Sequence, residues 1–173
     1  MSSSCEALLG AALALIGVTS GASLAIAQPA TPLASAESTN QACSGFTMGA
    51  PAMAEWQDMG GADGRLGCPT ANEVATVPSP AGVNSTVTAF GDRGGVYTIQ
   101  SGEQAGKAFA VTGCAWRLYF GYGGAGSWLG LPLEDAQNNP DGQTQKFEGG
   151  VITQTRATSD CDAEPTGPAS ESH

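Results

Sequence analysis

Two spacings of apolar residues alternate along the middle of the chain, and they predict short helices and β-hairpins. Helical spacing occurs at residues 53–57 and at 108–120, where Phe109, Val111 and Trp116 fall mostly on one side. Apolar and polar residues alternate on either side of two Gly-Gly pairs, each expected to supply the positive φ of a hairpin turn. The expected strand pairs are 86–90 with 96–99, and 144–147 with 151–155. These elements predict an α+β fold.

The order of these elements occurs twice, with the same turn residues in each copy. A Gly-Gly pair is followed by Leu-Gly-x-Pro, then by a Phe ahead of Gly-Gly-Val. The first copy has these groups at 60–61, 66–69, 90 and 94–96, and the second at 123–124, 129–132, 147 and 149–151. From Gly60 to Pro69 the two copies keep a constant offset of 63 residues. The chain is therefore expected to hold two tandem repeats, at about 46–100 and about 105–157, each with a short helix, a tight Leu-Gly-x-Pro turn and a hairpin.

The glycines and prolines of these turns have a conformational role. Gly61 and Gly124 are expected to adopt the left-handed conformation that ends a helix, and Pro69 and Pro132 exclude helix just before them. The Lys-Ser or Lys-Thr of a phosphate-binding loop is missing after them. Turn geometry is the favoured interpretation over a phosphate site.

At these motifs the sequence resembles the LGFP-repeat family of actinobacterial secreted and cell-wall proteins, over about residues 46–155. The family's Phe in Leu-Gly-Phe-Pro is Cys68 in the first copy and Leu131 in the second. The first copy also has an insertion, at 75–84, that reads as a loop. The resemblance implies a non-catalytic module without a cofactor, which holds on to the polysaccharide of a mycolate-type cell envelope.

The first 27 residues have the pattern of a secretory signal peptide. An apolar run at 8–18 precedes Ala25-Ile26-Ala27, a small-residue cleavage signal. The run is short for a membrane anchor and is followed by Thr and Ser, so no stable anchor is expected. We expect a protein that is secreted and associated with the cell wall.

The remaining chain divides by composition into three parts. Residues 28–42 are rich in Ala, Ser, Thr and Pro without an aromatic, and are expected to be a disordered linker. Residues 162–173 carry acidic residues among Pro, Gly and Ser, and are expected to be a disordered tail. The folded domain is expected at 43–161.

Removing the leader takes away Cys5 and leaves four cysteines, which in an exported chain indicate two disulfides. Four cysteines allow three connectivities, and the sequence does not choose among them. The expected pairing joins Cys43 to Cys161 across the ends of the domain and leaves Cys68 with Cys114. A zinc site would need Cys-x-x-Cys pairs or a nearby His, and the sequence has neither.

The sequence offers little for catalysis. Its one histidine is His173, the last residue, so a Ser-His or Cys-His nucleophile has no general base in the expected domain. Glu134 and Asp135 in the second copy and Glu73 in the first follow the Leu-Gly-x-Pro turns, and a pair of acids is what a glycosidase needs. Acids after a turn more often cap a helix or face solvent, so no enzyme is expected.

Charge and aromatic residues indicate the class of partner. The formal net charge of −10 disfavours nucleic acid and anionic lipid as partners. Neutral glycans are compatible with it, and proteins hold them by stacking sugar rings on aromatic faces. The candidate ligand-binding residues are Tyr97, Tyr122 and Trp128, whereas Trp116 and Phe120 are expected in the core. The sequence thus predicts a module that binds a cell-wall polysaccharide; a secreted protein–protein module and a carboxylate-dependent glycan hydrolase remain alternatives.

Overall fold

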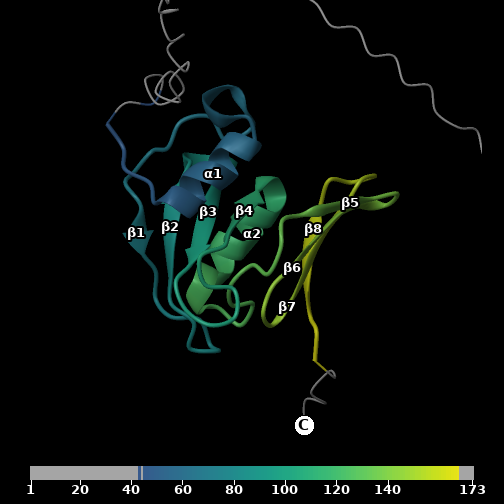
Figure 1. The fold of residues 1–173 in the computed structure, drawn as a ribbon. Coiled ribbons are helices and arrows are strands. Elements are labelled where there is room, and N and C mark those ends of the chain that lie inside the picture. The colour runs from purple at the N-terminus through teal and green to yellow at the C-terminus, as the bar shows by residue number, and fades with distance from the viewer. Residues whose placement is uncertain (1–42, 44, 168–173) are drawn as a thin grey trace, which may run out of the picture. The chain divides into compact units, whose positions relative to one another are not determined.

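The structure is a computed structural model that describes Cys43 and residues 45–167. Helix α1 (Ala50–Asp58) precedes one antiparallel sheet and helix α2 (Gly113–Tyr122) precedes another (Figure 1). In spatial order, the first sheet is β1 (Val74–Ala75), β2 (Ser85–Ala89), β3 (Gly94–Ile99) and β4 (Ala108–Thr112); the second is β5 (Gln137–Asn139), β6 (Gly142–Lys146), β7 (Gly150–Thr155) and β8 (Cys161–Pro165). The turns hold three short 3-10 helices, η1 (Gly61–Asp63), η2 (Gly91–Arg93) and η3 (Gly124–Gly126).

The α+β class is confirmed by these elements. The expected signal peptide at 1–27 and linker at 28–42 lie outside the described residues. Within the described part, neither helix is long and apolar enough to cross a lipid bilayer.

Successive residues of β3 face different helices. Val96 packs in one buried cluster with Trp56 of α1, whereas Tyr97 packs in the other with Trp116 of α2. Neighbouring residues of a strand point to opposite faces of the sheet, so α1 covers one face of the first sheet and α2 the other (Figure 1). The second cluster also contains Ile152 of β7, which places α2 between the two sheets.

The helix expected at 108–120 is wrong for its first five residues, which form strand β4. This strand pairs with β3, with Phe109 opposite Tyr97 and Val111 opposite Gly95. The pairing satisfies the backbone of β4 and turns Phe109 and Val111 toward α2, so tertiary pairing overrides the local helical pattern. Helix α2 begins at Gly113.

Both expected hairpins are confirmed, because β2 pairs antiparallel with β3 and β6 with β7. The expected positive φ is wrong for Gly95 in the first pair and for Gly149 and Gly150 in the second, which are not among the glycines with positive φ. Close packing explains the second pair of glycines. A Cβ at Gly149 would collide with the carbonyl oxygen of Trp128, and a Cβ at Gly150 would lie 2.7 Å from the Trp128 ring.

The two Leu-Gly-x-Pro turns have matching backbone geometry. Gly61 and Gly124 have φ values of 60° and 62°, in the left-handed region that the sequence predicts for them. They do not end the helices as expected, since each begins a 3-10 helix, and the left-handed residues just before them are Gly60 and Gly123, with φ of 97° and 106°. Gly67 and Gly130 have φ values of 66° and 68°. Each turn is also held by an aromatic residue of the preceding helix.

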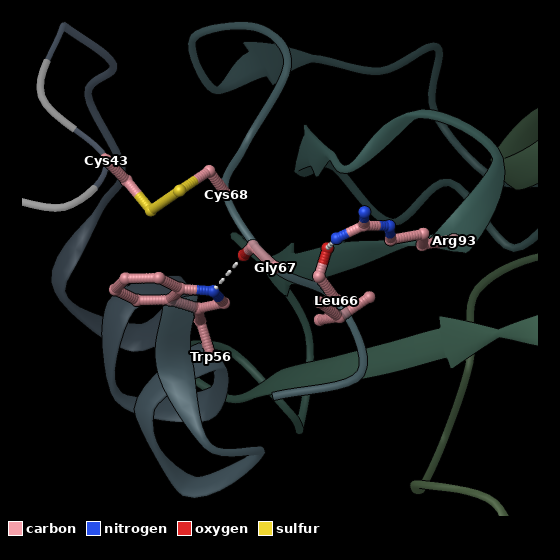
Figure 2. The surroundings of a disulfide bond; sticks show 6 residues. All are labelled: Cys43, Trp56, Leu66, Gly67, Cys68 and Arg93. Atoms are coloured by element: carbon pink, nitrogen blue, oxygen red, sulfur yellow. Dashed lines mark hydrogen bonds between the residues drawn. A yellow bond between two sulfur atoms is a disulfide. The ribbon is translucent and has the colours of Figure 1, made fainter. Parts of the chain in front are cut away.

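Each of these aromatic residues donates one hydrogen bond to a carbonyl group of the turn. Trp56 of α1 donates a hydrogen bond of 2.7 Å from Nε1 to the carbonyl oxygen of Gly67 (Figure 2). Tyr119 of α2 donates one of 2.7 Å from its hydroxyl to the carbonyl oxygen of Gly130. Both aromatic side chains are fully buried, so each turn is fixed to the core by a polar contact shielded from water.

The four cysteines form two disulfides, but the expected pairing is wrong: Cys43 is joined to Cys68, and Cys114 to Cys161. The Cα atoms are 5.3 Å apart in the first bridge and 5.9 Å in the second. Cys43 lies beside the turn that Trp56 holds, and hence next to Cys68 (Figure 2). Because β8 pairs with β7 beside α2, it brings Cys161 to the first turn of that helix. Each bridge closes one part of the domain instead of joining its ends.

The expected boundary of the acidic tail is also wrong. Residues 162–165 continue strand β8, in which Asp162 pairs with Thr153 and Glu164 with Val151. The bridge from Cys114 to Cys161 fixes the start of this strand, and the free edge of β7 supplies backbone partners for it. The folded domain therefore extends past Cys161.

Candidate functional site

The surface around the end of α2 carries two exposed aromatic rings in contact. Tyr122 is the last residue of α2, and Trp128 follows the short helix η3. Their ring centroids are 5.8 Å apart with an interplanar angle of 68°, an edge-to-face arrangement. Tyr122 is 46 % exposed and Trp128 is 42 % exposed, as a role in ligand binding requires.

Glycine geometry and hydrogen bonds hold the segment that joins the two rings. Gly123 ends α2 in the left-handed conformation, with φ of 106°. Ser127 donates from its hydroxyl to the carbonyl oxygen of Gly124 at 2.7 Å, and the amide of Gly149 donates to the carbonyl oxygen of Leu129 at 2.8 Å. The ring of Trp128 also packs on the backbone of strand β7, so the pair is organised before any ligand arrives.

Tyr97 does not belong to this surface, and its expected role in ligand binding is wrong. Its side chain is only 4 % exposed and packs edge-on against Tyr119, with 5.5 Å between ring centroids. Burial raises the pKa of the Tyr97 hydroxyl above its ordinary value. Tyr97 occupies the inward position of β3 that faces α2, and it is part of the core.

The other two aromatic residues of α2 differ in position. Trp116 is buried, as expected, and donates from Nε1 to the carbonyl oxygen of Gly91 at 3.0 Å. Phe120 was expected in the core as well, but it is 67 % exposed. Phe120 lies one turn beyond Trp116, and the centroids of the two rings are 5.5 Å apart. The rest of the Phe120 ring extends toward solvent near the end of the helix. The spacing of four residues places Trp116 and Phe120 on the same face of α2. The spacing does not show that the surface packed against this face stops before Phe120.

A separate polar cleft of about 500 Å³ lies between α1, the end of β4 and the segment before β5. Its side chains include two neighbouring carboxyl groups that interact electrostatically, those of Glu55 and Asp135. Asp135 Oδ1 also accepts a hydrogen bond of 2.9 Å from the amide of Ala110. Asp58, Arg65 and Thr112 complete the charged and hydroxyl-bearing lining on the side of the first sheet.

The carboxyl pair is electrostatically perturbed. Burial, and then the nearby charges of Asp135 and Asp58, raise the pKa of Glu55 to about 7. Burial also raises the pKa of Asp135, while the hydrogen bond from the amide of Ala110 opposes the rise. The sequence singled out Asp135 by its place after a turn. Glu55 was missed, because a single acid within an amphipathic helix gives no signal of its distant partner.

Glu73 and Glu134 do not line this cleft. Glu134 forms an ion pair with Lys146, with 3.3 Å between Oε1 and Nζ. The carboxylate of Glu73 accepts hydrogen bonds from the amide of Gly49 and the hydroxyl of Thr86.

The described residues contain no group of three or more His, Cys, Asp or Glu side chains arranged to hold a metal ion. The chain matches no protein-family model, and no curated protein is similar to it. The geometry of the described residues gives two candidate sites, the aromatic pair at the end of α2 and the carboxyl cleft beside β4.

Proposed function

We propose that this chain is an exported, non-catalytic module that binds a cell-envelope polysaccharide through Tyr122 and Trp128. The arabinogalactan and peptidoglycan classes are the ones that the LGFP-like motifs imply. The observation that carries the proposal is the pair of exposed rings, 5.8 Å apart, on a segment held by buried hydrogen bonds. Sugar rings bind to such aromatic surfaces by stacking, and a fixed surface loses little entropy on binding.

We also propose that the two parts of the domain are degenerate copies of one unit. Matching φ values at Gly61 and Gly124, and again at Gly67 and Gly130, support this proposal. The aromatic anchors support it too, because Trp56 and Tyr119 bind the carbonyl groups of turn residues at the same offset of 63 residues. Only the second copy has an exposed aromatic ring after its Gly-Gly pair: Trp128 stands where the first copy has Arg65. Ligand binding is accordingly proposed for the second copy.

Export is proposed on the leader sequence, and the two disulfides are compatible with it. The acidic net charge of −10 supports a neutral glycan over nucleic acid or anionic lipid. The proposed location is the cell wall.

Retention on purified wall fractions tests the proposal. The mature, disulfide-bonded protein is expected to remain on mycolate-type cell walls and to be released by soluble arabinan or galactan. Trp128→Ala and Tyr122→Ala are expected to reduce retention while leaving the disulfides and the melting temperature nearly unchanged. Phe46→Ala is the matched control, since Phe46 is an exposed aromatic residue (39 %) outside the pair. Equal retention of all these variants would refute the proposed site.

A secreted protein partner is the second candidate, and one observation favours it. Phe120 on α2 and Val77 in the loop before β2 add exposed apolar surface near the end of α2, and Val77 lies against Gly126 of η3. Exposed apolar surface of this kind often marks a protein interface. Retention that depends on Phe120 and Val77, and that soluble glycan does not compete, would favour this candidate.

A further inference from the structure

A small, mostly apolar cavity lies between one end of the first sheet and the second Leu-Gly-x-Pro turn, and the proposed function does not use it. Its volume is about 230 Å³. The residues that form its apolar wall are Val83, Ile99, Leu131, Pro132 and Leu133. Ile99 at the end of β3 and Leu131 in the turn are both buried, so this wall is part of the packed domain. The aromatic pair does not line the cavity, which is therefore distinct from the proposed polysaccharide site.

The carboxylate of Glu148 also lines the cavity, and two hydrogen bonds hold this residue to the turn. The amide of Leu131 donates to Glu148 Oε2 at 3.0 Å, and the amide of Glu148 donates to the carbonyl oxygen of Leu131 at 3.0 Å. Within the described part of the chain, Glu148 Oε1 takes part in no hydrogen bond. The carboxylate is therefore fixed through one oxygen and keeps the other as an acceptor before any ligand binds.

The backbone of the turn adds no free donor on this side of the cavity. The amide of Leu131 is already bound to Glu148, and Pro132 has no N–H group. The amide of Leu133 donates to the carbonyl oxygen of Lys146 at 3.0 Å. A ligand that reaches Glu148 therefore has to supply the hydrogen-bond donor itself.

The charged groups of the lining favour a cation as that donor. Glu103, in the turn after β3, is the second acid of the lining, and Ser101 and Gln104 beside it are uncharged. No Lys, Arg or His is among the residues that line the cavity. Among the described residues, neither Glu103 nor Glu148 forms an ion pair. A cationic group is attracted to this lining and an anionic group is repelled, more strongly than in open water because the apolar wall lowers the local dielectric constant.

The size of the cavity limits the ligand to a small molecule. Pockets for drug-sized ligands have volumes of about 300 to 1,000 Å³, and this one is smaller. One water molecule occupies about 30 Å³ of liquid, so the cavity has the volume of roughly seven or eight waters. A short hydrocarbon chain with one head group fits this space.

We propose that this cavity binds a small primary amine that carries a short hydrocarbon chain. The ammonium group donates to Glu148 Oε1, and the chain lies against Ile99 and Leu131. An ammonium group has three donors and no acceptor, which matches a turn that offers an acceptor and no free donor. The hydrocarbon chain leaves water for the apolar wall, which favours binding further. This site goes beyond the proposed polysaccharide binding and does not depend on it.

Three probes with the same chain and different head groups test the proposal on the full, disulfide-bonded protein. Hexylammonium, hexanol and hexanoate are titrated into nitrogen-15-labelled protein, and the NMR signals of the backbone amides are followed. Hexylammonium should give saturable shifts at the amides of Leu131 and Glu148. Hexanol should bind at least about fivefold more weakly, because it lacks the charge. Hexanoate should bind most weakly of the three. The absence of saturable shifts at these amides, or hexanol or hexanoate binding as tightly as hexylammonium, would overturn the proposal.

The variant Glu148→Gln removes the charge and keeps an oxygen that accepts from the amide of Leu131. It should weaken hexylammonium binding by about tenfold and hexanol binding by less than about twofold. Asp92→Asn is the matched control, since Asp92 is an exposed acid that does not line the cavity, and it should change both by less than about twofold. Equal weakening by the two variants would refute the role of Glu148. The ranking of the three probes on the wild-type protein decides the question even if Glu148→Gln does not fold.

Discussion

The indole N–H of Trp56 donates a hydrogen bond of 2.7 Å to the carbonyl oxygen of Gly67, eleven residues further along the chain (Figure 2). This contact fixes the Leu-Gly-x-Pro turn to α1, next to the disulfide of Cys43 and Cys68. In the second part of the domain the hydroxyl of Tyr119 does the same for Gly130. A carbonyl group that loses such a donor in the core stays buried without a partner, which is what makes the contact costly to remove.

Tyr119→Phe tests this cost with little change in volume. The variant should lower the free energy of unfolding by about 1 to 3 kcal/mol, because it leaves the Gly130 carbonyl group unpaired. Chemical denaturation under non-reducing conditions measures the change. Tyr122→Phe, three positions later at the exposed end of the same helix, should change it by less than about 0.5 kcal/mol. Equal effects at both positions would contradict the assigned role of Tyr119.

Replacing glycine by alanine should change the stability of the fold in opposite directions at two positions. Gly130→Ala should destabilise the fold by more than about 1 kcal/mol, since φ is 68° and the new methyl group would collide with the Glu148 side chain. Gly121→Ala lies within α2 with no atom near the added methyl group, and should stabilise the fold by about 0.5 to 1 kcal/mol. Melting curves of the two variants check the prediction, and a gain in stability at Gly130 would show that the turn is not constrained.

Peptide mapping should recover the two disulfides of the structure. Cleavage after Lys and Arg separates all four cysteines, because Arg65, Arg93 and Arg117 lie between successive members of the set. Mass spectrometry of the unreduced digest should find the peptide ending at Arg65 linked to 66–93, and the peptide 108–117 linked to 157–173. A link between 66–93 and 108–117 would instead indicate the pairing of Cys68 with Cys114.

Wall retention should depend only weakly on salt if the ligand is a neutral glycan. Binding to such a polymer releases no counterions, so raising NaCl from about 50 to about 500 mM should change the retained fraction by less than about twofold. Sedimentation with purified walls at several salt concentrations measures this. Release of the protein at moderate salt would identify a charged partner in place of a neutral sugar.

Signals within short segments of the sequence were enough to predict part of this structure correctly. The hairpins, the left-handed glycines 61 and 124 and the exposure of Tyr122 and Trp128 depend on residues within a few positions of each other. Alternation sets a strand pair, and a glycine with positive φ sets a turn, whatever the rest of the chain does. The number of disulfides was predicted correctly from the four cysteines that remain after the expected leader, without knowledge of the fold.

Only the tertiary structure decided the features that join distant residues. Residues 108–112 became strand β4 because β3 offered backbone partners, and Tyr97 was buried because α2 packs on that face of the sheet. The partner of Cys161 was decided by the pairing of β8 with β7. The contact between Glu55 and Asp135 joins residues 80 positions apart, and no spacing rule relates them. Contacts of this kind depend on which surfaces meet after folding, and the free energy that selects them comes from the whole packed arrangement and not from any one segment.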